Sequence, residues 1–368
     1  RGYESLMRYH GTANGLWTCD EHLCGPNPAN GVELCTVVEL MYSMEEMLSI
    51  TGTHVYADIL ELLAYNALPA TLTPDMCGHQ YVQQVNQIAA DKKKRQFFDA
   101  GKEANLYGIA PYYGCCAANM HQGFPKFAAN LCHRSAEGLA FLIYAPCTVD
   151  VEMSPGEKIV IQETTEYPFD NRISFEIVET NASELTLSYR IPGMTEGEIF
   201  YNGQSEGKYA PGIVKLEKNY KKGDRVEIVL DMPVTRVTNP DNSISFRMGP
   251  LLFALKISEE YTSLRGVEPF DDRQYRPKSD WNLAPVLKSG EAEILEIKRH
   301  GIPDMPFDVE KPPITIKLMG AKVNNWKLYK NSAGPYPANP SISDETTIEL
   351  VPYGSTNIRV AQFPVVEK

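Results

Sequence analysis

The sequence lacks the features that mark several large classes of protein. No apolar run approaches the ~20 residues of a membrane-spanning helix, which argues against a membrane partner. Positive charge is not in excess either, because the formal net charge is -12 at pH 7. A chain of this sign is repelled by nucleic acid and by anionic membranes. A neutral, polar ligand is easier to accommodate.

The start of the chain, Arg1-Gly2-Tyr3, carries neither an initiator methionine nor a signal peptide. We therefore expect residue 1 not to be the natural N-terminus and any export signal to lie upstream of it. No C-x-x-C motif is present, which disfavours a thiol redox protein. The eight cysteines show no regular disulfide spacing, and a chain of 368 residues buries a core without cross-links. We expect most thiols to be reduced.

Three cysteines and a glutamate suggest a metal site. Cys115 and Cys116 are adjacent, and Glu33 and Cys35 form a second pair far upstream. Three soft ligands and one hard ligand have the number and type that close a four-coordinate zinc site. Two other interpretations remain open from these residues alone. The cysteines could fill core volume, since free cysteine is often buried, or the adjacent pair could form a vicinal disulfide.

The spacing of these residues predicts the local backbone. Residues i and i+2 point in opposite directions on a helix but to one side in extended chain, so Glu33 and Cys35 should lie in extended chain or at the frayed start of a helix. Apolar residues then recur at helical spacing over residues 34–50 until Gly52. Cys115 and Cys116 are expected in a loop whose backbone bends so that both reach one ion.

The character of the sequence changes near residue 135. Helical patterns dominate before it, at residues 34–50, 54–68 and around 117–132. Short alternating runs bounded by Gly, Pro and Asn follow, a pattern typical of antiparallel β-sandwiches. They cover residues 139–144, 158–164, 173–178, 185–191, 225–230, 244–248, 251–257, 314–318, 347–351 and 357–362. Asn202-Gly203 is a hairpin signal between two of the later runs.

A second break lies at Asn239-Pro240-Asp241-Asn242. The sequence thus predicts a mixed multidomain fold, with a helical part at residues 1–135, a first β-sandwich at 136–238 and a second at 239–368. The basic run Lys92-Lys93-Lys94-Arg95 is predicted to be a solvated loop or helix face, because the chain as a whole is acidic.

Several side chains in the helical part suit a sugar ligand. Residues 79–87 concentrate amides, a phenol and an imidazole, and amides such as those of Gln84 and Asn86 bond well to hydroxyl groups. His121 follows the cysteine pair and is a further candidate. A polar surface strand explains the first segment equally well, and a satisfied, partly buried histidine explains the second.

Glycoside hydrolysis also needs a carboxylic acid. Glu21 lies ahead of Glu33 in a stretch rich in Gly, Pro and Asn, which makes it a candidate general acid. Asp20 is an alternative. Three further glutamates, Glu39, Glu45 and Glu46, lie in the predicted helix and are better explained as surface charge.

These elements together resemble glycoside hydrolase family 127, the β-L-arabinofuranosidase family formerly grouped as a domain of unknown function, or the related family 146. The resemblance runs in order from about residue 10 to 135. Its elements are Trp17-Thr18-Cys19-Asp20-Glu21, Glu33-Leu34-Cys35, the helix that follows, Tyr65-Asn66-Ala67-Leu68-Pro69-Ala70, Gly114-Cys115-Cys116 and His121-Gln122-Gly123-Phe124-Pro125-Lys126.

The resemblance implies a zinc-dependent retaining exo-glycosidase. Matched residue by residue, Cys115 is the nucleophile, Glu33, Cys35 and Cys116 are the other zinc ligands, and Glu21 is the acid/base. Zinc holds the sulfur as thiolate at neutral pH. The carboxyl group then protonates the leaving oxygen and activates water against the thioglycosyl intermediate.

Two departures separate this chain from the family. The family's catalytic domain is an (α/α)6 barrel, and residues 1–135 supply only part of its helices, so the chain looks like the C-terminal part of a longer protein. Where the arabinofuranosidases read Tyr-Val-Asn-Pro, this chain reads Gln84-Val85-Asn86-Gln87, which leaves the identity of the sugar open.

The function implied by the resemblance is hydrolysis of β-L-arabinofuranosides or a related plant cell-wall sugar, with zinc as cofactor. The partner would be a plant glycan or an arabinosylated glycoprotein, and the compartment periplasmic or extracellular. The alternative is a non-catalytic carbohydrate-binding or scaffold protein with a structural zinc site, because closed four-ligand sites are usually structural. Sequence gives no indication of oligomeric state.

Overall fold

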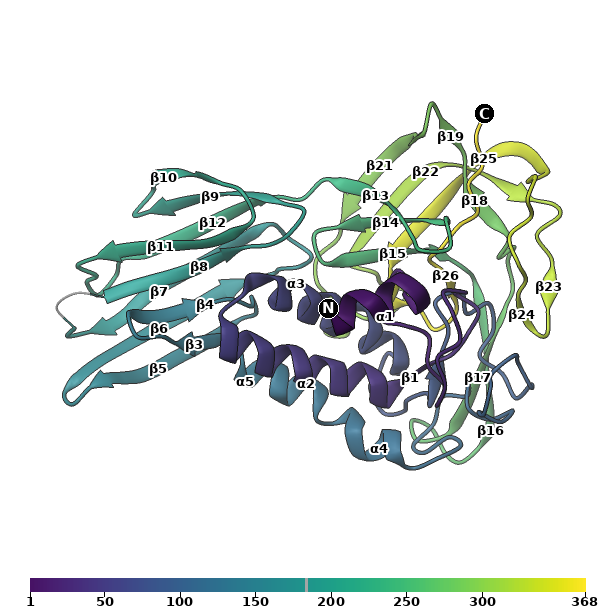
Figure 1. The fold of residues 1–368 in the computed structure, drawn as a ribbon, viewed down its shortest axis with the longest axis horizontal. Helices are drawn as coiled ribbons and strands as arrows, with labels where there is room; N and C mark the ends of the chain where they lie inside the picture. The colour runs from purple at the N-terminus through teal and green to yellow at the C-terminus, as the bar shows by residue number, and fades with distance from the viewer. Residues whose placement is uncertain (183–184) are drawn as a thin grey trace. The chain divides into compact units, whose positions relative to one another are not determined.

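The computed structural model describes residues 1–182 and 185–368, and most of its regular structure is strand (Figure 1). It divides into two compact units. Unit 1 comprises Arg1–Met41, Leu62–Gly123 and Thr235–Lys368, and unit 2 comprises Tyr42–Glu61 and Phe124–Val234. The boundaries at residues 135 and 238 stay a prediction.

The helices are few and short. The α-helices are α1 (Gly2–His10), α2 (Leu34–Thr51), α3 (His54–Leu62), α4 (Cys115–Met120) and α5 (Gly123–Ala129), with a π turn at Leu63–Ala67 and 3-10 turns at Pro69–Thr71 and Tyr353–Ser355. The helix predicted at 34–50 is confirmed by α2, which ends where Gly52 adopts a φ of +63°. The helix predicted at 54–68 changes to a π turn after Leu62, just ahead of Pro69.

The single helix predicted around residues 117–132 is wrong. Helices α4 and α5 replace it, separated by a turn at His121 and Gln122, and Cys132 lies in a strand. Gly123 begins α5 with its Cα so close to Leu68 that an added Cβ would lie 2.7 Å from a Leu68 methyl carbon. The apolar spacing alone did not reveal this interruption.

Unit 2 contains a six-stranded sheet and a four-stranded sheet, ordered β10-β9-β12-β7-β6-β5 and β11-β8-β4-β3. All neighbours are antiparallel except β4 and β8, which are parallel. The strands are β3 (Cys132–Arg134), β4 (Gly138–Phe141), β5 (Cys147–Ser154), β6 (Glu157–Thr165), β7 (Arg172–Thr180), β8 (Leu185–Ile191), β9 (Glu196–Tyr201), β10 (Gln204–Tyr209), β11 (Gly212–Lys218) and β12 (Arg225–Asp231).

Aromatic rings fill the core of unit 2. Phe141 and Phe175 come from different sheets, and their centroids lie 4.7 Å apart, with Tyr189 next to both. A buried ion pair joins this core to α3, because the guanidinium of Arg190 contacts Glu61, which also accepts a 2.6 Å hydrogen bond from the Tyr167 hydroxyl. Breaking such a buried pair by removing one partner is strongly destabilising.

Unit 1 contains an eight-stranded sheet ordered β13-β14-β15-β25-β22-β18, with β21 paired to β22 and β26 paired to β15. Four strand pairs lie outside it: β1-β2, β16-β17, β19-β20 and β23-β24. Its strands are β1 (Val32–Glu33), β2 (Val82–Gln83), β13 (Val234–Thr238), β14 (Ile244–Met248), β15 (Leu251–Lys256), β16 (Glu259–Arg265), β17 (Asp272–Pro277), β18 (Leu283–Pro285), β19 (Leu287–Lys288), β20 (Glu291–Ala292), β21 (Ile294–Arg299), β22 (Ile314–Val323), β23 (Leu328–Tyr329), β24 (Ser332–Ala333), β25 (Ile342–Pro352) and β26 (Arg359–Val360).

Each of the ten alternating runs predicted from the sequence overlaps a strand, and the hairpin is confirmed as well. Asn202 and Gly203 have φ values of +49° and +80° and join β9 to β10. Positive φ at both central residues is what a two-residue type I′ turn requires. The predicted break at residues 239–242 is likewise a turn, between β13 and β14, with Asn242 at a φ of +64°.

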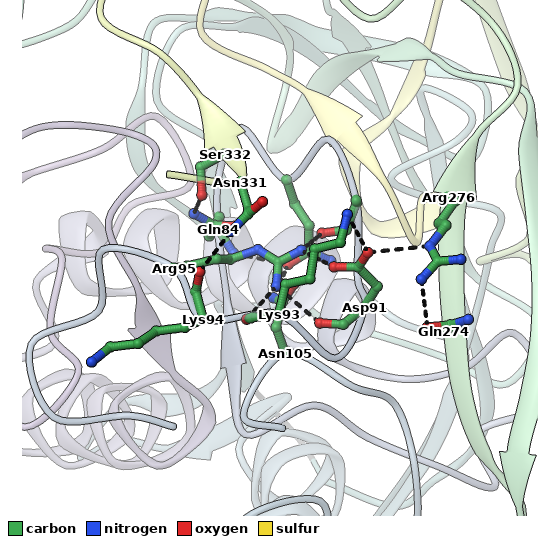
Figure 2. Close-up of polar contacts among 12 residues, drawn as sticks. Gln84, Asp91, Lys93, Lys94, Arg95, Asn105, Gln274, Arg276, Asn331 and Ser332 are labelled. Atoms are coloured by element: carbon green, nitrogen blue, oxygen red, sulfur yellow. Dashed lines mark hydrogen bonds and ion pairs between the residues drawn. The ribbon is translucent and has the colours of Figure 1, made fainter. Parts of the chain in front are cut away.

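The basic run at residues 92–95 is not solvated throughout. The Arg95 side chain has no exposed surface and pairs with Asp91, whose oxygen lies 2.8 Å from Arg95 Nη2 (Figure 2). Its guanidinium also donates to the backbone carbonyls of Ala89, Asp91 and Lys93. The prediction was wrong for Arg95 because a tight loop and the Asp91 carboxylate bind both of its terminal nitrogens, although the lysines remain exposed.

No helix within the described residues is long and apolar enough to cross a membrane.

Candidate active site and metal centre

Strand β1 and helix α2 together place Glu33 and Cys35. Glu33 ends β1, which pairs with β2 in antiparallel register, and the Leu34 amide donates to the Tyr81 carbonyl at 3.0 Å. Cys35 then lies in the first turn of α2. The change from extended chain to helix between them is the geometry that the i, i+2 spacing predicted.

Cys115 and Cys116 occupy the first two positions of α4, directly after Gly114. The predicted loop is therefore wrong, because the bend falls before the pair and the helix begins with it. Cys116 is fully buried, whereas Cys115 is partly exposed. Of the two adjacent thiols, Cys115 is thus the one that solvent, and hence a substrate, can reach.

The four predicted ligands converge. One ligand atom from each of Glu33, Cys35, Cys115 and Cys116 lies within 4.8 Å of all the others. The Cys35 and Cys116 sulfurs are 3.3 Å apart, and Glu33 Oε1 lies 3.6 Å from Cys115 Sγ and 3.7 Å from Cys116 Sγ. A zinc tetrahedron with ~2.3 Å sulfur bonds and ~2.1 Å oxygen bonds has edges of about 3.6–3.8 Å. The donor set and its spacing therefore fit zinc.

The thiols of this cluster perturb one another. A hydrogen bond from Cys116 lowers the pKa of Cys35, and the same contact, with burial, raises the pKa of Cys116. Burial and the neighbouring Cys35 raise the pKa of Cys115. Of the three thiols, Cys35 thus loses its proton most readily. A divalent cation would favour the thiolate form of all three, because a coordinated thiol is deprotonated.

Tyr81 connects the cluster to the candidate acid. Its hydroxyl donates to Glu21 Oε1 at 2.5 Å and also lies near enough to the Cys115 thiol to affect the pKa of that thiol. That contact lowers the pKa of Cys115, in opposition to burial, and burial together with the Glu21 contact raises the pKa of Tyr81. A single hydroxyl therefore contacts both the predicted nucleophile and the predicted acid, which places these two groups at one site.

A small cleft opens beside these residues. It measures about 200 Å³ and is lined by Glu21, Tyr81, Asp99, Ala100, Tyr112 and Tyr113. Glu21 is exposed and has a φ of +77°, and Tyr112 has a φ of +69°. Left-handed backbone at non-glycine residues costs energy and concentrates at functional sites. Two such residues in one small cleft support a functional role for it.

Asp20 holds the loop that carries Glu21. The Asp20 carboxylate accepts a hydrogen bond from the Phe98 amide and lies 3.2 Å from the Cys24 thiol. It is fully buried, unlike its neighbour Glu21. Burial raises the pKa of Asp20, and these hydrogen bonds oppose the rise. Of the two acids considered from the sequence, Glu21 is the accessible one.

The amide-rich segment after Tyr81 is buried. Gln84 donates to the carbonyl of Ala29 and, at 2.9 Å, to the Ser332 hydroxyl (Figure 2). Asn86 donates to the Gln362 carbonyl at 2.8 Å and accepts from the Ala361 and Gln362 amides. These amides join the β2 region to the C-terminal part of unit 1. A role for Gln84 and Asn86 in binding substrate stays a prediction.

His121 follows α4 and is exposed, with Nδ1 3.2 Å from the Ala117 carbonyl. Its role in binding substrate also stays a prediction. Two residues outside the predicted ligand and acid sets also affect the site. Tyr81 bridges Glu21 and Cys115, and the Asn119 side chain hydrogen-bonds Cys35. The three-residue step from Cys116 to Asn119 along a helix is one signal for the second.

Family models match two parts of the chain. The model described as the catalytic domain of GH127 β-L-arabinofuranosidase matches residues 12–129, and the model of the GH127 middle domain matches residues 138–232. Together they cover more than half of the chain.

Individual proteins and structures agree with these matches. The chain is 22% identical over 360 residues to a non-reducing end β-L-arabinofuranosidase of Bifidobacterium longum subsp. longum, covering 93% of this chain and 50% of that protein. A GH127 β-arabinofuranosidase structure gives a TM-score of 0.71 at 16% identity, covering 100% of this chain and 56% of the other. The β-L-arabinofuranosidase of Geobacillus stearothermophilus T6 gives 0.65 at 18%, covering 93% and 51%. The chain thus spans about half the length of these relatives.

Proposed function

We propose, from the premise that this chain belongs to glycoside hydrolase family 127, that it is the catalytic-site portion of a retaining glycosidase that releases β-linked L-arabinofuranose or a related sugar. The observation that carries the proposal is the contact of one hydroxyl, that of Tyr81, with both Glu21 and Cys115 beside a cleft. A purely structural zinc site has no need of an exposed acid close to a partly exposed thiol.

Glu33, Cys35, Cys115 and Cys116 would hold zinc, which when bound supplies the positive charge that keeps these thiols deprotonated. Their mutual distances support the assignment. We infer the sugar from the relatives, since both the Bifidobacterium and the Geobacillus proteins are β-L-arabinofuranosidases.

The proposed reaction then proceeds through two displacements at the anomeric carbon. In the first, the Cys115 sulfur bonds to the anomeric carbon as the bond from that carbon to the leaving oxygen breaks, and Glu21 gives its proton to that oxygen. In the second, Glu21 takes a proton from water, the water oxygen bonds to the anomeric carbon and the carbon–sulfur bond breaks. Two inversions leave the configuration retained.

Tyr81 orients this pair. Its hydroxyl donates to the Glu21 carboxylate and can turn toward the Cys115 sulfur when Glu21 is protonated. The same hydroxyl thus positions the acid and the thiolate in both displacements. Asp20 contributes by fixing the backbone of the loop through the Phe98 amide.

The architecture proposed with this function is an incomplete (α/α)6 barrel followed by two β-sandwiches. The few helices of the region around the cleft and the β-rich remainder support it, as do the matching structures at TM-scores of 0.65–0.71. Plant glycans or arabinosylated glycoproteins are the proposed substrates, and a periplasmic or extracellular location suits them.

The substitution Glu21→Gln tests the acid. Loss of general acid/base help should lower the rate by roughly 10²–10⁴-fold on a substrate with a poor leaving group such as an alkyl β-L-arabinofuranoside. The loss should be smaller on an activated 4-nitrophenyl β-L-arabinofuranoside, which needs little protonation. Initial rates on the two substrates measure this. An equal loss on both would contradict an acid role and indicate a binding role for Glu21.

A further inference from the structure

A second cavity lies in unit 1 and shares no lining residue with the catalytic cleft. It measures about 240 Å³, compared with about 200 Å³ for the cleft. Its walls come from residues 26–29 and 333–336, with Asn86 and Asp241 completing the lining. The first of these segments lies between Glu21 and Glu33 in the chain, so one wall of the cavity belongs to the loop that joins the acid to a metal ligand.

Most of the wall is apolar, and its shape is fixed. The ring of Tyr336 packs against Trp326 with centroids 5.4 Å apart. Its hydroxyl donates to the Gln362 carbonyl at 3.0 Å and lies 3.2 Å from Asn86 Nδ2. With its polar end bound to the protein, the tyrosine offers the cavity chiefly its aromatic ring. The other apolar lining residues are Pro26, Pro28, Ala29, Ala333 and Pro335.

Two polar groups at the cavity keep unused hydrogen-bonding capacity. Asp241 Oδ1 accepts from the Ser243 amide and hydroxyl, but Oδ2 has only a 3.3 Å contact with Gln362 Nε2 among the described residues. Asn27 is exposed, and its Oδ1 accepts from the Ala29 amide while its Nδ2 has no partner in the described part of the chain. One acceptor and one donor therefore remain for a ligand.

Hydrogen bonds to neighbouring segments hold the walls of the cavity in place. The backbone N–H of Asn86 donates to the Pro28 carbonyl at 3.0 Å. The side-chain amide of Gln84 donates both to the Ala29 carbonyl and to the Ser332 hydroxyl. Figure 2 shows the Gln84–Ser332 contact beside the bond from Asn331 Nδ2 to the Lys94 carbonyl, 2.9 Å long. A site held in this way need not be ordered on binding, and preorganisation favours affinity.

We propose that this cavity binds one neutral sugar ring of the glycan substrate, as a subsite separate from the catalytic cleft. The proposal rests on the proposed function for the class of substrate. The cavity volume of about 240 Å³ lies below the ~300–1,000 Å³ of sites for drug-sized ligands. The cavity therefore has room for one sugar ring and not for a longer oligosaccharide. The C–H face of a sugar packs on Tyr336 and the prolines, and its hydroxyl groups satisfy Asp241 and Asn27.

Other ligands fit these groups less well. A wholly apolar ring would bury Asp241 Oδ2 with only its 3.3 Å contact to Gln362 Nε2, which is costly for a charged oxygen. An anionic ring would meet the Asp241 carboxylate in a chain whose net charge is already -12. The nearest competitor is a proline ring of a peptide, which could stack on the same walls but offers no hydroxyl group.

The test uses Asn27→Ala and Asp241→Asn, with Asp280→Asn as the matched control. Asp280 is an exposed carboxylate of the same unit, paired with Lys322 and outside the cavity. Steady-state rates are compared on 4-nitrophenyl β-L-arabinofuranoside, whose one sugar fills only the cleft, and on an L-arabinofuranosyl trisaccharide. Each cavity variant should raise KM for the trisaccharide about fivefold or more, the effect of losing one hydrogen bond. In these variants kcat for the trisaccharide and the rates on the aryl glycoside should be unchanged. The control variant should match the unchanged protein on both substrates.

Titration calorimetry with the trisaccharide on Glu21→Gln protein separates this proposal from the proposed function. Weaker binding in the cavity variants, with normal binding in Asp280→Asn, supports the subsite even if the protein hydrolyses nothing. Normal hydrolysis with an unchanged trisaccharide KM in both cavity variants overturns the subsite and leaves the proposed function standing. A competition titration with an oligoproline peptide gives a second way to overturn the subsite. The subsite is overturned if the peptide displaces the trisaccharide and binds equally well to the unchanged protein and to the Asn27→Ala and Asp241→Asn variants.

Discussion

Tyr81 is the residue on which the proposed chemistry depends most. It contributes one hydroxyl, which donates to Glu21 at 2.5 Å and also affects the pKa of Cys115. The sequence placed Tyr81 among several polar residues without distinguishing it. A two-residue strand pairing, β1 with β2, brings it to Glu33, and pairs this short leave no periodic pattern to detect.

Substituting Tyr81→Phe should slow catalysis while the ring continues to fill its space. Loss of a hydrogen bond to a charged group, worth about 1.5–3 kcal/mol, corresponds to a roughly 10- to 100-fold fall in kcat/KM. Because the Tyr81 hydroxyl lowers the pKa of Cys115, its removal should also slow alkylation of Cys115 by iodoacetamide at pH 7 in metal-free protein. Tyr113→Phe, at the exposed rim of the cleft, serves as the control. Faster alkylation in Tyr81→Phe would contradict the assignment.

Among the residues, the sequence predicted the ligand set better than the surroundings. The candidate ligands Glu33, Cys35, Cys115 and Cys116 converge, and their residue types were the signal that marked them as a possible metal site. Gln84 and Asn86 show the limit, since an amide that binds a sugar and an amide that joins two buried segments have the same composition. Only the three-dimensional partners, such as Ser332 and Gln362, distinguish the two uses.

At the scale of the elements, α2 shows both a success and an error of sequence reasoning. Its periodicity and the glycine that ends it were sufficient to predict it. Glu45 was expected on the surface, yet it is buried, and neither carboxylate oxygen has a hydrogen-bond partner within the described residues. Local spacing does not reveal that α5, with Lys126, contributes to this environment.

Glu45 makes the stability of the protein depend on pH. Burial raises its pKa from 4.5 to about 7. The native state therefore holds this proton more tightly than the unfolded state, and stability falls as pH rises from about 4.5 through 7. Glu45→Gln should stabilise the protein at pH 8 by roughly 1–3 kcal/mol and have little effect at pH 4.5.

Urea unfolding of the Glu45→Gln variant at both pH values measures this effect. Glu46→Gln is the matched control, because Glu46 is the exposed neighbour on the same helix. A stabilisation of equal size at both pH values would contradict the proposed cause, since it would not depend on the charge of Glu45.

At the scale of the whole molecule, the sequence predicted strands and turns well and the long-range pairing hardly at all. The ten runs and the Asn202-Gly203 hairpin depend on local patterns. The compact units do not follow the order of the chain, because unit 1 combines residues from both ends. Contacts such as Asn66 with the Pro250 carbonyl, 184 positions apart, determine that grouping and leave no local pattern.

The proposed zinc ion should contribute to the stability of unit 1, because its four candidate ligands come from two distant segments. Removing it with a chelator should lower Tm by roughly 5–10 °C, the equivalent of a few kcal/mol of binding energy. Since the pKa values of Cys115 and Cys116 are raised, zinc must displace their protons. The apparent affinity should therefore rise about 10- to 100-fold per unit of pH between 6 and 7. A competition assay with a chromophoric chelator measures this, and an affinity independent of pH would contradict thiol ligation.

The most direct test of the central claim, that Cys115 is the nucleophile of a glycosidase site, is covalent trapping. The protein is incubated with a β-L-arabinofuranosyl derivative that carries a haloacetamide at the anomeric position, then digested and analysed by mass spectrometry. The account predicts one adduct, on Cys115, that is suppressed by excess L-arabinose and absent from a Cys115→Ser variant. An adduct confined to Cys116, or hydrolytic activity fully retained in Cys115→Ser, would contradict the account and return the four residues to a structural role.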